Sequence, residues 1–164
     1  MHDKRLVIII GHYGSGKTEF AVNYAVKMKE IYENVSIADL DIVNPYFRTR
    51  EKREFLESIG VKVYDSSIRN TSIDIPALPA ELTGVFLNQN IRSIIDVGGD
   101  PVGAKVLSRY ADQIKSTEYD MFYVINGNRP ETSTVEGVIK YLKMIEATSR
   151  LKVTGLINNT HLLK

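Results

Sequence analysis

The stretch GHYGSGKT, residues 11–18, decides how this chain folds. Four of its residues fit the spacing G-x-x-x-x-G-K-[ST]: Gly11, Gly16, Lys17 and Thr18. Glycines let the backbone turn its N–H groups toward phosphate oxygens, and a helix that begins at the loop adds the partial positive charge of its N-terminus. The stretch therefore predicts a phosphate-binding loop between a strand and a helix.

Each residue type in this loop has an expected role. Lys17 supplies a cation for the β- and γ-phosphates of a nucleotide, and we expect it to be catalytic. The hydroxyl of Thr18 is an expected ligand of Mg²⁺. Contacts to the nucleotide are expected along the whole loop, from Gly11, His12, Tyr13, Gly14, Ser15, Gly16, Lys17 and Thr18.

The residues on either side of the loop favour a strand before it and a helix after it. Residues 6–10, LVIII, form a continuous apolar run bounded by Gly11, which is typical of a strand covered on both faces. After Lys17, apolar side chains recur every three or four positions, which predicts a helix with one face on the sheet. The expected contact residues are Phe20, Ala21, Tyr24, Ala25, Met28 and Ile31.

The same alternation continues along the chain. Further strands are expected at residues 35–40, 61–64, 91–97, 121–125 and 153–157, and further helices at 50–59, 103–115 and 132–148. The helix at 50–59 is expected to stop at Gly60, and the polar residues 65–79 to form a surface excursion. This pattern predicts an α/β fold with a parallel sheet and helices on both faces, whose ligands bind at the carboxyl ends of the strands.

Length and composition indicate one domain over residues 1–164. The chain has 43% hydrophobic residues, and 21 Lys and Arg balance 20 Asp and Glu, so charge gives no support for a nucleic-acid or membrane partner. The absence of Cys excludes disulfides and thiolate metal sites and fits a cytoplasmic protein. No closing helix follows the sixth strand, so we expect the domain to be C-terminally incomplete; a naturally short variant is the alternative.

Two acidic motifs follow predicted strands. Asp39 and Asp41 lie two apart at the exit of the second strand, where either side chain can reach magnesium or a water molecule. Asp96 ends the fourth strand in the sequence D-x-x-G and is expected at the same magnesium ion. The N–H of Gly99 can approach a γ-phosphate, so its position would differ between triphosphate and diphosphate states.

With these motifs the chain resembles the deviant phosphate-loop ATPases of the CobQ/CobB/MinD/ParA superfamily, in the SIMIBI class of P-loop NTPases. The group contains septum-site and partition ATPases, metal-centre maturation ATPases and cobyrinate amidases. The resemblance implies ATP and Mg²⁺ as cofactors, Thr18, Asp39 and Asp96 at the metal, and Asp41 as the catalytic residue that positions water. It also implies that Asn158 or Asn159, after the sixth strand, reads the base.

His12 is a departure from the group's pattern. The group has a second Lys at this position, which reaches the nucleotide of the other subunit in a homodimer. The resemblance therefore implies a nucleotide-dependent homodimer, whereas His12 puts that in question; His12 is either a weaker, pH-dependent substitute or an ordinary loop residue. The guanine signature N-K-x-D is replaced by NNTH at residues 158–161, which favours ATP.

Other residues carry weaker signals. Residues 44–48, NPYFR, have the composition of a partner contact, or else they pin the next helix onto the sheet. Asp100 can assist magnesium or cap the following helix, and Arg129 can meet phosphate, although a loop arginine usually faces solvent.

Three classes of function fit these observations. The first is a slow ATP-hydrolysing switch acting on a protein client, which uses all four motifs. The second is a small-molecule kinase or ligase in which residues 65–79 serve as a lid, and the third is a module that binds nucleotide without hydrolysing it. A GTP-binding switch is a variant of the first class.

Overall fold

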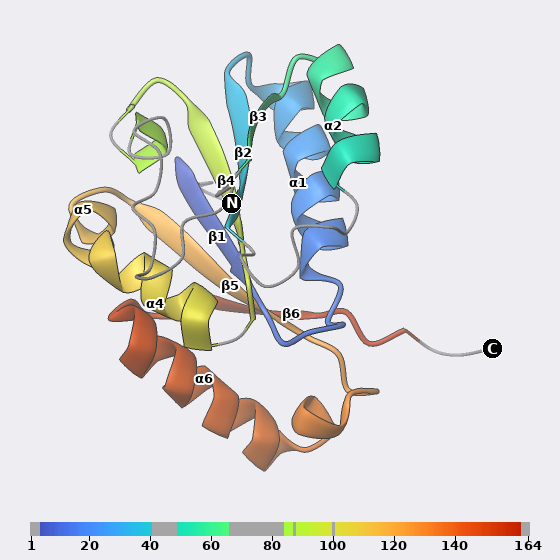
Figure 1. The fold of residues 1–164 in the computed structure, drawn as a ribbon, viewed down its shortest axis with the longest axis vertical. Helices are drawn as coiled ribbons and strands as arrows, with labels where there is room; N and C mark the ends of the chain where they lie inside the picture. The colour runs from blue at the N-terminus through green and yellow to red at the C-terminus, as the bar shows by residue number, and fades with distance from the viewer. Residues whose placement is uncertain (1–3, 41–48, 66–83, 87, 100, 162–164) are drawn as a thin grey trace, which may run out of the picture.

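The computed structural model describes residues 4–40, 49–65, 84–86, 88–99 and 101–161 (Figure 1). The strands are β1 (Leu6–Ile10), β2 (Val35–Leu40), β3 (Lys62–Asp65), β4 (Arg92–Val97), β5 (Tyr119–Ile125) and β6 (Gly155–Asn158). The helices are α1 (Lys17–Ile31), α2 (Thr49–Ser58), α4 (Pro101–Arg109), α5 (Ala111–Lys115) and α6 (Val135–Ser149), with a 3₁₀ turn η1 (Pro130–Thr132).

The six strands form one parallel sheet in the order β3-β2-β4-β1-β5-β6. The strand that precedes the glycine-rich loop, β1, lies between β4 and β5, so Leu6 pairs with both Ser93 and Tyr119. Figure 1 shows α1 and α2 on one face of the sheet and α4, α5 and α6 on the other. The predicted α/β fold class is confirmed.

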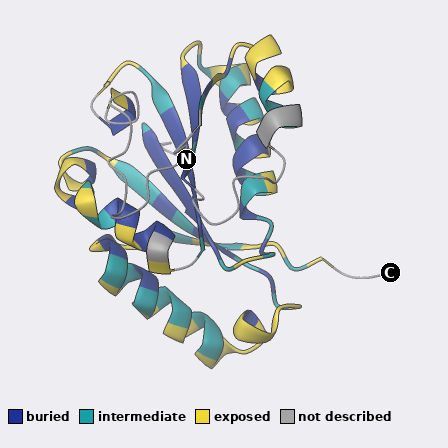
Figure 2. Cartoon of the chain, viewed as in Figure 1, coloured by how far each residue is buried: buried dark blue, intermediate teal, exposed yellow. Residues whose placement is uncertain are grey.

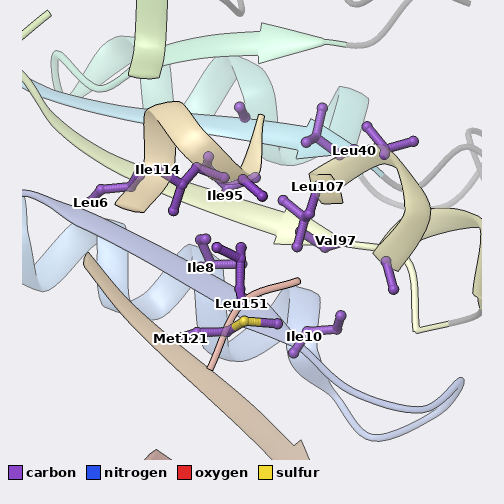
Figure 3. Close-up of a cluster of buried hydrophobic side chains, with 14 of the residues drawn as sticks. Leu6, Ile8, Ile10, Leu40, Ile95, Val97, Leu107, Ile114, Met121 and Leu151 are labelled. Atoms are coloured by element: carbon purple, nitrogen blue, oxygen red, sulfur yellow. The ribbon is translucent and has the colours of Figure 1, made fainter. Parts of the chain in front are cut away.

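Each face of the sheet buries its own apolar core. Alternate residues of β1 point to opposite faces, because side chains along a strand alternate. Ile9 packs toward α1, together with Ala21, Ala25 and Met28. Ile8 and Ile10 belong to the other core, which Figure 3 shows together with Val97, Leu107, Met121 and other side chains. Figure 2 shows the central strands buried along their length, as predicted for β1.

Two predicted helices differ from those in the structure. The predicted helix at 103–115 is two helices, α4 and α5, because the N–H of Tyr110 turns back to the carbonyl of Leu107 and the Tyr110 ring stacks on Phe86. The predicted helix at 132–148 begins only at Val135, since the Thr134 hydroxyl accepts the N–H of Gly137 as an N-cap.

Smaller differences have local causes. The expected contact residue Ile31 is 64% exposed, because it is the last residue of α1, and Val22 is buried on that helix instead. The sixth strand begins at Gly155 rather than residue 153, since the carboxylate of Glu146 binds the N–H of Val153 in a turn. Bounds of the other elements agree with the predictions within two residues, and residues 66–79 lie outside the described ranges.

Gly60 stops α2 as predicted. Its φ of 83° lies in the left-handed region, which glycine adopts without steric cost. The N–H of Val61 then donates to the carbonyl of Leu56 at 2.9 Å, the hydrogen bond that closes a helix of this kind.

Candidate functional site

The glycine-rich loop joins the buried strand β1 to the N-terminus of α1. Gly14 and Gly16 have φ values of 74° and 83°, so both need the freedom of glycine. The N–H of Ser15 donates to the carbonyl of His12 at 3.0 Å and closes the turn. Lys17 is the first residue of α1 and is buried.

The three residues expected at magnesium come together. The hydroxyl of Thr18 donates to Oδ2 of Asp96 at 2.5 Å, which joins the first turn of α1 to the end of β4. Asp39 of β2 is the direct neighbour of Asp96 in the sheet, and residues in register share a face, so both carboxylates lie on the side of α1.

The donor set at this point suits a magnesium ion that keeps other oxygen ligands. Within the described ranges no group of three or more His, Cys, Asp or Glu residues is arranged to hold a metal ion. A closed protein cage is therefore absent from that part of the chain. Mg²⁺ commonly binds through one or two protein oxygens together with water and substrate phosphates, and Thr18 with Asp96 and Asp39 can provide such a partial set.

Gly99 lies directly against the glycine-rich loop. A Cβ atom built on Gly99 would be 1.7 Å from the carbonyl oxygen of Gly11 and 3.0 Å from Cα of His12. The turn after β4 and the loop after β1 are therefore in backbone contact. A displacement of one would be transmitted to the other, which is what the proposed response to a γ-phosphate requires.

His12 is turned toward its own chain. Its side chain is 24% exposed, its Nδ1 lies 3.8 Å from Oε2 of Glu131, and its ring meets the edge of Tyr141 at 5.3 Å between centroids. Tyr141 in turn stacks on Tyr123, whose pKa burial raises to about 12, so that phenol stays neutral. Tyr13, by contrast, is 70% exposed.

Of the two candidate base-reading residues, Asn159 is the one in contact with the loop. Its Nδ2 donates to the carbonyl of Ser15 at 2.9 Å, and its N–H donates to Ile125. The other candidate, Asn158, is exposed, and its Oδ1 accepts the N–H of Thr160 at 3.0 Å.

Two residues that the sequence analysis did not place at the loop also contact it. Asn126, at the end of β5, and Arg129 both donate to the carbonyl of Gly14, at 3.2 and 3.1 Å. Asn126 could have been found from its position, because it ends a strand as Asp39 and Asp96 do. For Arg129 the sequence indicated only that it can meet phosphate, and not that it contacts the backbone of the loop.

Several predicted residues cannot be placed. Asp41, Asp100 and residues 44–48 lie outside the described ranges, so their roles stay predictions from the sequence.

A cavity of about 260 Å³ lies at the opposite end of the sheet, lined by residues that include Arg5, Tyr32 and Arg92. The guanidinium of Arg92 lies 3.5 Å from the centroid of the Tyr32 ring. Arg5 donates to the carbonyls of Phe86 and Asn88 at 2.7 and 2.8 Å. These cations already have partners within the protein, and the predicted motifs lie at the other end of the strands.

Neither a protein-family model nor a curated protein matches this chain. Solved structures do match: FlhF complexed with GTP and Mg²⁺ has a TM-score of 0.56 at 12% identity, covering 96% of this chain and 65% of that one. A nucleotide-binding protein from Archaeoglobus fulgidus in complex with ADP has a TM-score of 0.53 at 15% identity, covering 93% and 65%. FtsY from Elizabethkingia anophelis in complex with GDP has a TM-score of 0.54 at 17% identity, covering 96% and 49%.

These similarities concern the fold. The chain shares its fold with these nucleotide-binding proteins, and it spans less than two thirds of the length of each of them. In the part of the chain that the structure describes, no helix has the length and apolar character needed to cross a membrane.

Proposed function

We propose that this chain binds Mg·ATP and hydrolyses it slowly, as a switch that acts on a protein client. The observation that carries the proposal is the contact between Thr18 and Asp96, 2.5 Å apart, beside Asp39 and at the start of the helix that Lys17 begins. The same residues combine a cation, a hydroxyl and two carboxylates at the end of a glycine-rich loop, which is the donor set that phosphoryl-transfer sites use.

Each residue has a role in this proposal. Lys17 and the N–H groups of the loop bind the phosphates, since both are positive and lie at a helix N-terminus. Thr18 and Asp96 hold the magnesium, with Asp39 nearby. Bound Mg²⁺ supplies charge neutralisation to the phosphate chain. Asp41 orients the attacking water, and Gly99 couples the loop to the turn after β4.

Adenine is the proposed base because of Asn159. Its Nδ2 is used by the carbonyl of Ser15, whereas its Oδ1 accepts no hydrogen bond from the described residues. A carbonyl oxygen accepts from the exocyclic amine of adenine but repels the O6 oxygen of guanine. The sequence NNTH at residues 158–161 also lacks the acidic residue of the guanine signature.

Two alternatives remain open to experiment. A GTP-binding switch is favoured by the ligands of FlhF and FtsY, which were solved with GTP and GDP. A small-molecule kinase or ligase on the same scaffold would hydrolyse ATP poorly until its acceptor is supplied. Membership of the CobQ/CobB/MinD/ParA superfamily is part of the proposal and rests on the motifs of the loop, D-x-D and D-x-x-G.

Titration with Mg·ATP, Mg·ADP, Mg·GTP and Mg·GDP tests the site. We expect adenine nucleotides to bind more tightly, and Lys17→Ala to weaken ATP binding about tenfold or more, since it removes a buried cation from a multiply charged ligand. Lys140→Ala, which removes an exposed cation of α6, is the matched control and should bind as the wild type does. Unchanged affinity in Lys17→Ala would contradict the site.

Hydrolysis is tested separately through Asp41→Asn. This variant should bind Mg·ATP normally and release no phosphate above background, because the amide cannot orient water as the carboxylate does. Turnover at the wild-type rate would assign that role to another residue. A wild-type protein that binds ATP but has no basal turnover fits either the kinase alternative or a module that only binds nucleotide.

A further inference from the structure

The loop after β5 contacts the glycine-rich loop through two side chains. Asn126 and Arg129 both donate to the carbonyl oxygen of Gly14, at 3.2 and 3.1 Å. The guanidinium group also covers Gly14 closely, since a Cβ atom built there would be 2.6 Å from Cζ of Arg129. In Figure 1 the segment between β5 and α6, in orange, lies next to the loop that joins β1 to α1.

The loop after β5 is itself held in one conformation. Asn126 is buried, and its Oδ1 accepts the N–H of Asn128 at 3.0 Å. Its carbonyl oxygen accepts the hydroxyl of Thr132 at 2.7 Å and the N–H of Arg129 at 3.1 Å. The backbone from which the Arg129 side chain extends is therefore fixed relative to β5, and Arg129 has a defined anchor.

The contact fixes the orientation of one peptide group of the loop. In a trans peptide the C=O and the following N–H point in opposite directions, so holding the Gly14 carbonyl toward Arg129 directs the N–H of Ser15 away from it. That N–H closes the turn with His12. Glycine has more backbone freedom than any other residue type. Restricting Gly14 before the nucleotide arrives therefore removes an entropy cost from binding.

We propose that Arg129 is a positioning residue of the phosphate-binding loop: by holding the Gly14 carbonyl it preorganises the loop for the phosphates of the nucleotide. The inference rests on the proposed nucleotide-binding function. It assigns to Arg129 an action through the loop backbone, because its Nε donates to the carbonyl of Gly14.

The test compares Arg129→Ala with the wild type in two measurements. The dissociation constant of Mg·ADP should rise about 3- to 10-fold, the range expected for one lost hydrogen bond. In the protein without nucleotide, amide hydrogen exchange of a peptide covering residues 11–18 should become faster. The melting temperature should stay unchanged, because Arg129 is exposed.

Lys140→Ala controls for the loss of one positive charge on an exposed position and should change neither measurement. Arg129→Lys keeps the charge without the planar guanidinium, so it should bind Mg·ADP more weakly than the wild type. Weaker binding with unchanged exchange, or full recovery in Arg129→Lys, would show that only the charge matters and overturns the proposal. Unchanged affinity in Arg129→Ala overturns it as well. If the wild-type protein binds neither Mg·ATP nor Mg·ADP, the result instead contradicts the proposed function itself.

Discussion

Gly99 is the residue at which the two halves of the site touch. The atoms it would meet if it carried a Cβ are backbone atoms of Gly11 and His12, which cannot move aside as a flexible side chain can. Glycine is required at this position by contact, because the backbone of Gly99 does not have the positive φ of Gly14 and Gly16. The requirement could not be derived from the sequence, which showed only that D-x-x-G ends in glycine.

Gly99→Ala should therefore displace the glycine-rich loop. We expect a loss of roughly 1–3 kcal/mol in the free energy of unfolding, the usual cost of overpacking, together with a loss of nucleotide binding. Urea denaturation and titration with Mg·ADP measure the two effects. Gly84→Ala is the control, since among the described residues no atom beyond its own chain neighbours lies within 4 Å of a Cβ built at Gly84. A Gly99→Ala protein with wild-type stability and affinity would contradict the contact.

At the scale of elements, the ends of helices and strands determine where the chain turns and which residues contact the glycine-rich loop. The left-handed conformation of Gly60 ends α2, and the hydrogen bond from Val61 to Leu56 turns the chain toward β3. The ends of β4, β5 and β6 supply Asp96, Asn126 and Asn159, each of which contacts the residues of the loop or of the first turn of α1.

Gly60→Ala tests the importance of that helix end. Alanine at φ 83° should lower the free energy of unfolding by about 1 kcal/mol, because its Cβ is strained in the left-handed region. The Cβ would also lie 3.1 Å from Cε of Lys29, which can move. Gly84→Ala again serves for comparison and should be neutral or slightly stabilising under the same urea denaturation. Equal stability of the two variants would count against a left-handed helix end.

The sequence predicted elements better than the contacts between them. Periodicity and glycine positions gave β1 and β2 at their observed bounds, because buried strands and helix stops are local signals. The break at Tyr110 was missed, since it depends on stacking with Phe86, far away in the sequence. For the same reason the sequence left Asn158 and Asn159 as alternatives, whereas in the structure it is Asn159 that reaches the carbonyl of Ser15.

At the scale of the whole molecule, the orientation of His12 bears on assembly. The ring packs against Tyr141, and its Nδ1 faces Glu131 of the same chain. To reach the nucleotide of a second subunit, the His12 side chain would first have to leave both contacts.

We therefore expect the solution mass to stay that of a monomer with Mg²⁺ and a non-hydrolysable ATP analogue, as with ADP. Light scattering under both conditions measures this. A mass that doubles only with the ATP analogue would contradict the expectation and would restore the nucleotide-dependent homodimer, with His12 rearranged.

The position of β1 in the middle of the sheet also affects how the chain folds while it is being synthesised. Leu6 pairs with Ser93 on one side and with Tyr119 on the other, so both neighbours of β1 are synthesised long after it. On the ribosome, the apolar run Leu6–Ile10 has no partner strand until β4 and β5 have emerged. Pairings this distant in sequence form slowly, and an unpaired apolar strand favours aggregation. In an unfinished chain, β1 therefore lacks one of its two partner strands until β5 is complete.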